Sequence, residues 1–97
     1  MEITPTILKE FKDRMHITHS SEDDNLSFLL QSSYADIKQK CGEFDIQENV
    51  RGKELVFERA RYAYNDALEY FDDNFLSQIN SFSFSLMLEE GDSDEEV

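Results

Sequence analysis

The stretch Ser20–Gly42, SSEDDNLSFLLQSSYADIKQKCG, decides the fold of this chain. At 100° per residue, one face of a helix over this stretch collects small and apolar side chains, namely Leu26, Leu29, Leu30, Ser33, Ile37 and Cys41. About twenty residues of helix span roughly 30 Å, which is the width of a small domain. We therefore expect the rest of the chain to pack against this helix.

Both ends of this helix are marked in the sequence. Ser20 or Ser21 can cap the N-terminus by accepting a hydrogen bond from a backbone N–H of the first turn. Ser21 and Asp24 have the spacing of a capping box, and the acidic first turn suits the positive end of the helix dipole. At the other end Lys40 suits the negative pole, and Gly42 supplies a left-handed stop.

Two further helices are predicted, one on each side of this stretch. The first begins at Thr4 and Pro5, because threonine is a good cap and proline fits the first helical position, and it fades near 15–17. The third begins near Gly52 or Lys53, and neither glycine nor proline marks its end. Its apolar sector contains Val56, Phe57, Ala60, Ala63, Tyr64, Ala67, Leu68 and Phe71, and Phe75 and Ile79 continue the row.

The loop over residues 43–52 carries three apolar side chains, Phe44, Ile46 and Val50. We expect them to be held against the core. Ile46 and Val50 could instead mark an early turn of the third helix.

The segment 81–88, SFSFSLML, changes from helical spacing to alternation, with Phe82, Phe84, Leu86 and Leu88 on one side. Alternation is typical of a half-buried strand, and no second strand in the chain can pair with it. The sequence therefore predicts an all-α, three-helix bundle of antiparallel helices over residues 1–80. An extended β-strand arm over 81–88 and a disordered acidic tail over 89–97 come after it. The arm either adds to a sheet in another protein or folds back on its own helices.

The charge of the chain limits its partners. The formal charge is −13 for 97 residues, which argues against free binding to nucleic acid or to an anionic membrane. Residues 1–61 hold all nine Lys and Arg against twelve acids, whereas residues 62–97 hold ten acids and no base. No apolar run is long enough to span a bilayer, and we expect no membrane partner. The single cysteine allows no internal disulfide and fits a reducing compartment.

Catalytic chemistry is not indicated by the spacing of reactive residues. His16 and His19 lack a third ligand at a usual spacing, and we interpret them as loop histidines. Cys41 lies on the apolar face of the second helix without a partnering base, which indicates a buried, inert thiol. The three glycines are isolated, so no phosphate-binding loop is present. We expect no enzymatic activity, metal or cofactor.

Three groups of residues are candidates for contacts with other molecules. The face of the second helix opposite its leucines is uncharged, which is the composition of an interface core, and contains Phe28, Gln31, Ser32, Ala35 and Gln39. A basic cluster contains Arg51, Lys53, Arg59 and Arg61, which could meet an acidic surface of a neighbouring copy. In the alternative, Arg51 and Lys53 are solvated, while Arg59 and Arg61 pair with nearby acids such as Glu58 or Asp66. The polar side of the third helix presents Asp66, Glu69, Asp72 and Asp73.

The chain resembles the small head–tail connector (adaptor) proteins of tailed bacteriophages. The resemblance covers roughly residues 7–75. It rests on the helix entries and apolar spacings of the first two helices, which are Leu8-Lys9-Glu10-Phe11, Ile17, Glu22-Asp23-Asp24-Asn25-Leu26, Leu29-Leu30 and Cys41-Gly42. The tyrosines of the third helix, Tyr62, Tyr64 and Tyr70, are also similar. It implies a structural subunit of the virion, made in the host cytoplasm. Such subunits form a ring below the portal, a dodecamer if matched to the portal, and extend the channel through which DNA passes without specific binding. The ring is also the platform for the next neck or tail-completion protein.

Within such a ring, each candidate surface has an expected partner. We expect Phe28, Gln31, Ala35 and the basic cluster to form the subunit interface, and the arm to bind the portal through Phe82, Phe84, Leu86 and Leu88. Asp66, Glu69, Asp72 and Asp73 would face the channel, where weak repulsion keeps DNA mobile. The alternative is a small acidic inhibitor that mimics DNA or binds a protein, although a mimic should spread its acids over a folded surface.

Overall fold

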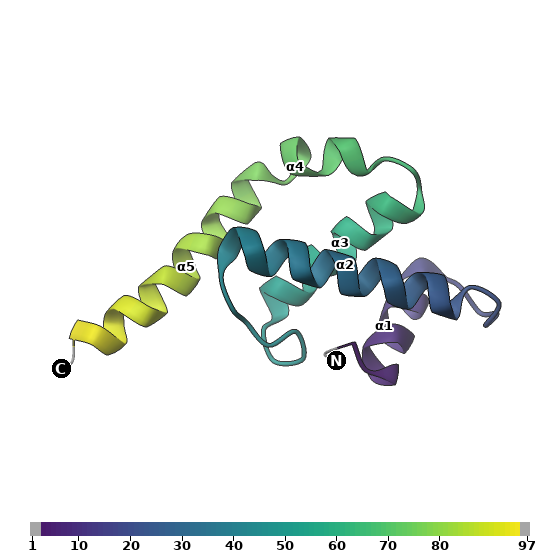
Figure 1. Ribbon diagram of the computed structural model, residues 1–97, viewed down its shortest axis with the longest axis horizontal. Coiled ribbons are helices and arrows are strands. Elements are labelled where there is room, and N and C mark those ends of the chain that lie inside the picture. The colour runs from purple at the N-terminus through teal and green to yellow at the C-terminus, as the bar shows by residue number, and fades with distance from the viewer. Residues whose placement is uncertain (1–2, 96–97) are drawn as a thin grey trace.

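A computed structural model describes residues 3–95 of the chain, with side chains as far as residue 89. The elements are α1 (Pro5–Met15), α2 (Asp23–Cys41), α3 (Val50–Tyr64), the 3-10 helix η1 (Leu68–Tyr70), α4 (Phe71–Asn74) and α5 (Leu76–Glu95) (Figure 1). Every element within residues 3–95 is a helix. The predicted all-α class is therefore confirmed, but the helices are more numerous than the predicted three.

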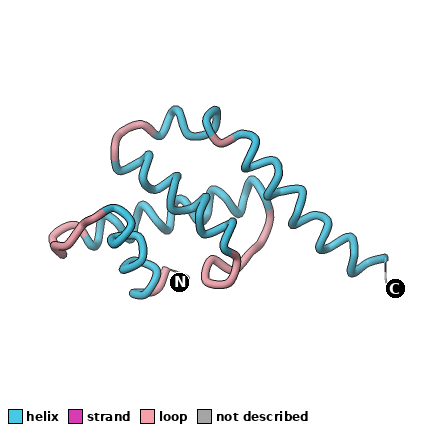
Figure 2. The backbone as a smooth tube through the Cα atoms, turned by 180° about the vertical axis from the view of Figure 1, so that it is seen from behind, coloured by secondary structure: helices cyan, strands magenta, loops and turns pink. Residues whose placement is uncertain are grey.

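Helix α2 is the centre of the fold. It contacts α1, α3 and α5, and the molecule measures 51 × 28 × 18 Å because α5 projects from one end (Figures 1 and 2). The core takes side chains from α1, α2, α3, α4, α5 and the α2–α3 loop, including Ile7, Phe11, Leu26, Leu30, Ile37, Ile46, Val56, Ala60, Phe71, Ile79, Phe82 and Leu86. The leucine face predicted for residues 20–42 is thus the face that lies against the other helices.

The ends of α1 and α2 agree with the sequence only in part. Thr4 caps α1 as predicted, since its Oγ1 accepts a hydrogen bond from the backbone N–H of Ile7 at 3.2 Å. The predicted serine cap of α2 is wrong: Glu22 is the capping residue and makes no side-chain capping bond. The Oγ of Ser21 lies instead 2.9 Å from Nδ1 of His19. Gly42 ends α2 with φ of 118°, a backbone conformation that glycine tolerates and other residues do not.

Helix α3 begins at Val50, because Asn49 accepts a hydrogen bond from the backbone N–H of Gly52 at 3.0 Å and so caps it. Val50 is therefore in the first helical turn and exposed, and the expectation that it is held against the core is wrong. Ile46 is fully buried, as expected. The hydroxyl of Tyr34 fixes this loop by donating to the carbonyl of Phe44 and accepting from the N–H of Ile46.

The predicted third helix ends at Tyr64 rather than continuing toward Ile79. Asp66 has φ of 58°, and the N–H of Ala67 donates to the carbonyl of Tyr62, which reverses the chain. The turn brings Phe71 and Phe75 back onto the ring of Tyr62, with ring centroids 5.7 and 5.6 Å away. Aromatic contact across the turn replaces the continuous i+4 row that the sequence indicates.

The predicted strand over residues 81–88 is wrong, because this segment is part of α5. In a helix, Phe82 and Leu86 share one face and Phe84 and Leu88 share another. Phe82 and Leu86 are 1% and 8% exposed, whereas Phe84 and Leu88 are 58% and 49% exposed. The backbone bonds of a helix are internal, so this segment needs no sheet edge in another protein.

The predicted tail over 89–97 also differs from the structure. Helix α5 runs as far as Glu95, because its docked first half nucleates the helix and no proline interrupts the second half. Residues 96–97 lie outside the described residues. The predicted division at residue 80 falls within α5.

Candidate functional site

The outer face of α5, formed by Phe84, Met87 and Leu88, is the strongest candidate for a binding surface. All three side chains are exposed, and their spacing of three and four residues places them side by side on one face of the helix. Among the four residues predicted to bind the portal, only Phe84 and Leu88 are on this face. Met87 was not among those predicted, although reading 84–88 with a period of 3.6 would have found it.

The N-terminal half of α5 is held firmly against the body of the protein. The ring of Phe82 meets the ring of Phe44 edge-on at 5.1 Å between centroids. Arg51 donates a hydrogen bond to Ser81 at 2.8 Å, and its guanidinium lies 5.9 Å from the centroid of Phe82. These contacts orient the outer face of α5 away from the core.

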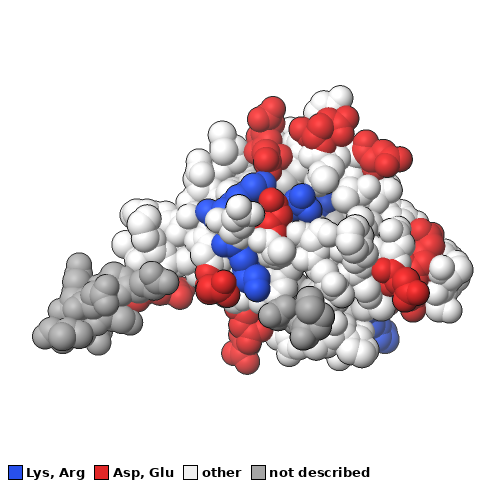
Figure 3. Space-filling model, in the orientation of Figure 1, with Lys and Arg blue, Asp and Glu red and all other residues white. Residues whose placement is uncertain are grey.

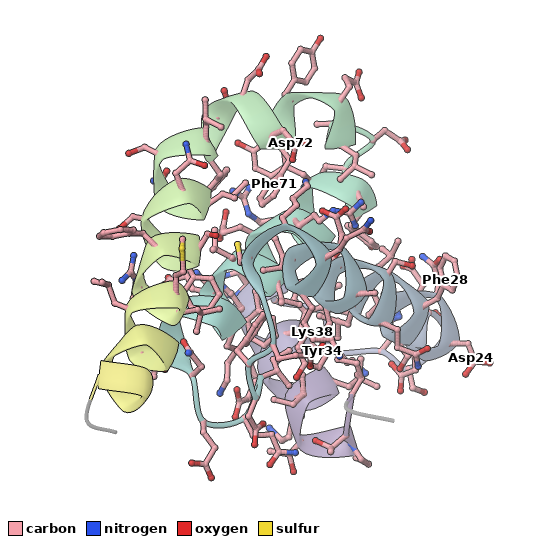
Figure 4. The ribbon with its side chains drawn as sticks, turned by 60° about the vertical axis from the view of Figure 1, so that its left-hand side comes forward. Asp24, Phe28, Tyr34, Lys38, Phe71 and Asp72 are labelled. Carbon is pink, nitrogen blue, oxygen red and sulfur yellow. The ribbon has the colours of Figure 1, made fainter. Side chains whose placement is uncertain are left out.

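The uncharged strip on α2 is also at the surface. Phe28 is 64% exposed, Ala35 and Gln39 are exposed, and Gln31 and Ser32 are half-buried. Figure 4 shows Phe28 near Asp24, on the side of the molecule away from α5. The uncharged strip on α2 and the apolar outer face of α5 are therefore two separate surfaces.

The predicted basic cluster is not one patch. Its four side chains leave α3 in different directions, and each one contacts a partner in its own chain: Arg51 with Ser81, Lys53 with Glu10, Arg59 with Asp36 and Ser33, and Arg61 with Glu58. The predicted pairing of Arg61 with Glu58 is confirmed, and the hydrogen bond between them raises the pKa of Arg61. Lys53 is paired rather than free in solvent.

A network of charges around Asp36 joins α2, α3 and the segment after α3. Arg59 Nε lies 3.1 Å from Asp36 Oδ2, and Lys40 Nζ lies 2.7 Å from the same oxygen and 2.5 Å from Asp72 Oδ1. Arg59 also donates to the hydroxyl of Ser33, which is fully buried. Burial lowers the pKa of Lys40, but the hydrogen bonds to Asp36 and Asp72 outweigh it and raise that pKa. The pair between Lys40 and Asp72 joins α4 to α2.

The acids predicted for the channel lie beyond α3 rather than on it. Asp66 is in the turn after α3, Glu69 in η1, and Asp72 and Asp73 in α4, and all four are exposed. Figure 3 shows acidic side chains along the edge of the molecule formed by η1 and α4. Asp72 is paired with Lys40, which is distant in sequence.

Ser21 with His19, and Cys41, are the described side chains that bear on nucleophilic chemistry. Ser21 contacts His19, but the nearest carboxylate oxygen of Glu22 is 3.9 Å from the imidazole and accepts a hydrogen bond from Tyr64. Both Ser21 and His19 are open to solvent. Burial raises the pKa of Cys41, which keeps it a thiol.

The described part of the chain offers neither a metal site nor a membrane span. Within it, no group of three or more His, Cys, Asp or Glu side chains could hold a metal ion. Among the same residues, no helix is both long and apolar enough to cross a bilayer. Comparison of the chain with protein-family models, curated proteins and solved structures gave no match. The surfaces themselves are therefore the basis for a functional proposal.

Proposed function

We propose that this protein is a structural, non-enzymatic head–tail adaptor subunit of a tailed bacteriophage. Copies would form a ring below the portal, extend the DNA channel and provide the docking platform for the next neck protein. The observation that carries the proposal is the outer face of α5, where Phe84, Met87 and Leu88 are exposed on a helix that projects from an acidic chain. The connector-like pattern over residues 7–75 supports it.

A protein partner accounts for the outer face of α5 better than any small molecule. Three large apolar side chains grouped on a helix match the way an amphipathic helix enters a groove in a partner. Burying each would contribute roughly 1.5–3 kcal/mol before the costs of association. This helix-in-groove contact replaces the strand addition expected from the alternating sequence.

A ring of identical subunits needs two different surfaces on each copy, one for each neighbour. The strip around Phe28 on α2 and the outer face of α5 are two such surfaces. The acidic edge with Asp66, Glu69 and Asp73 would face the channel, where negative charge weakly repels the DNA backbone.

The test combines the full-length chain with the portal protein of the same phage and uses electron microscopy to look for an added ring. The variant Phe84→Asp/Leu88→Asp should fold, because both side chains are exposed, and should lose the ring. Val50→Asp is the control, since it places an aspartate on another exposed apolar residue, and it should keep the ring. A wild-type chain that never joins the portal, or that competes with DNA for basic proteins, would contradict the proposal.

A further inference from the structure

A groove with acidic walls lies between the α2–α3 loop and α5. Its volume is about 240 Å³, and Phe44 and Leu86 are its apolar floor. Among the described residues, every charged one that lines it is an acid. The polar lining consists of Glu43, Asp45, Glu48, Asn49 and Glu89. We call this the acidic groove.

Two of the four acids are available to a basic group from outside. Glu43 lies 4.0 Å from Lys38 Nζ, and Asp45 accepts a hydrogen bond from the N–H of Gln47 at 2.9 Å. Glu48 and Glu89 are exposed, and within the described part of the chain neither forms an ion pair. The long apolar stem of a lysine or arginine could cover the floor of the groove while its charged head reaches these two carboxylates.

The acidic groove adjoins the apolar outer face of α5. Leu86 and Glu89 are three residues apart, so they share the side of the helix toward the α2–α3 loop. Leu88 directly precedes Glu89 and belongs to the outer face together with Phe84. One partner that covers the outer face can therefore also reach the acidic groove.

A second copy of the chain is a poor source of the basic group, because each of its nine lysines and arginines already contacts a partner in its own chain. The contacts are Lys9 with Asp13, Lys12 with Asp23, Arg14 with Glu54, Lys38 with Glu43, Lys40 with Asp36, Arg51 with Ser81, Lys53 with Glu10, Arg59 with Asp36 and Arg61 with Glu58. Two copies of charge −13 also repel each other. The charge of the chain thus favours a basic partner of a different kind.

We propose that α5 docks against an apolar surface with a basic rim on a different protein. Apolar residues of that surface cover Phe84 and Leu88, and a lysine or arginine of its rim enters the acidic groove between Glu48 and Glu89. Exposed ion pairs contribute little affinity, so the apolar contact holds the partner and the charges select it. The inference rests on the proposed function, in that it states the chemistry of the partner surface that α5 meets.

A short helical peptide with a leucine face and arginine elsewhere is the probe, and a peptide with the same leucines and glutamate elsewhere is its control. Fluorescence anisotropy at moderate salt measures the binding of each labelled peptide to the full-length chain. The arginine peptide should bind and the glutamate peptide should not. Replacing the apolar face in Phe84→Ser/Leu88→Ser should weaken binding about tenfold or more.

The acidic groove is tested by Glu48→Gln/Glu89→Gln, which should weaken binding of the arginine peptide about threefold to tenfold. Glu69→Gln/Asp73→Asn is the matched control, since it removes two exposed acids of η1 and α4 and leaves the same net charge, and its affinity should be that of the wild type. Equal weakening in both variants would show attraction to the overall charge and overturn the inference. So would equal binding of the two peptides.

The portal protein separates this inference from the proposed function. If the ring forms as readily with Glu48→Gln/Glu89→Gln as with the wild type, the adaptor role stands and the basic rim is wrong. If the peptides behave as expected but the wild-type chain never joins the portal, the basic partner stands and the adaptor role fails. If neither the arginine peptide nor the portal binds, both are wrong.

Discussion

The ring of Phe44 lies over the α-carbon of Gly52, so close that a β-carbon added at Gly52 would be 2.3 Å from Phe44 Cε2. The same β-carbon would be 2.9 Å from Phe82 Cζ. Phe44 cannot easily withdraw, since its ring also meets that of Tyr34 edge-on at 5.2 Å. Because Gly52 of α3 has no side chain, the ring of Phe44 can pack over α3 while it contacts both Tyr34 of α2 and Phe82 of α5.

Gly52→Ala should destabilise the protein, although alanine favours helix more than glycine. Overpacking a core typically costs about 1–3 kcal/mol, and the propensity gain of about 1 kcal/mol offsets only part of it. Urea unfolding followed by circular dichroism measures the change. Val50→Ala, in the same helix but exposed, should stay near the wild-type value. A Gly52→Ala protein as stable as wild type would mean that Phe44 is not held as described.

Two phenylalanines two residues apart test whether 81–88 is helical. Phe82 is buried and Phe84 exposed, so Phe82→Ala should cost about 3–5 kcal/mol. Phe84→Ala should stay within about 0.5 kcal/mol of wild type. The comparison is made in the isolated full-length chain, because a partner would also cover Phe84. Equal effects at both positions would instead favour a strand with both rings on one side.

The Arg59–Asp36 pair should show strong coupling in a double-mutant cycle with Arg59→Met and Asp36→Asn. Both side chains are largely buried, so we expect a coupling energy of about 1–2 kcal/mol in the free energy of unfolding. The exposed Lys9–Asp13 pair is the control and should give about 0.3–0.5 kcal/mol. Coupling at Arg59–Asp36 no larger than in this control would show that the pair is solvated.

Stability should fall as the pH becomes alkaline. The pKa values of Lys40 and Cys41 are both raised in the folded protein, so the folded state holds these protons more tightly than the unfolded state. Their contribution is fully present below the unfolded-state pKa values, about 8.5 for cysteine and about 10.4 for lysine, and is lost as the pH rises through the folded-state values. Urea midpoints between about pH 7 and pH 11 measure the slope. In the Cys41→Ala variant, the loss of stability should begin only at the higher pH at which lysine loses its proton. An unchanged pH profile would contradict the role of the thiol.

The sequence by itself determined the helical class and the position of α1 and α2. Their apolar residues recur at helical spacing over many turns, and Thr4, Pro5 and Gly42 mark ends that the structure keeps. It also indicated most of the core side chains of α2 and α3, because a long amphipathic helix has only one face to bury.

Only the tertiary structure decided the ends of α3 and the conformation of residues 81–88. An alternating run from Phe82 to Leu88 is compatible with a strand that buries every second residue or with a helix that buries every fourth. The choice depends on Phe44, which lies over Gly52 and offers a surface for Phe82, and on Tyr62, which gathers Phe71 and Phe75 after the chain has turned. Such contacts join residues far apart in the chain, so local spacing does not encode them. Contact between distant aromatic rings therefore left Phe84, Met87 and Leu88 exposed on α5.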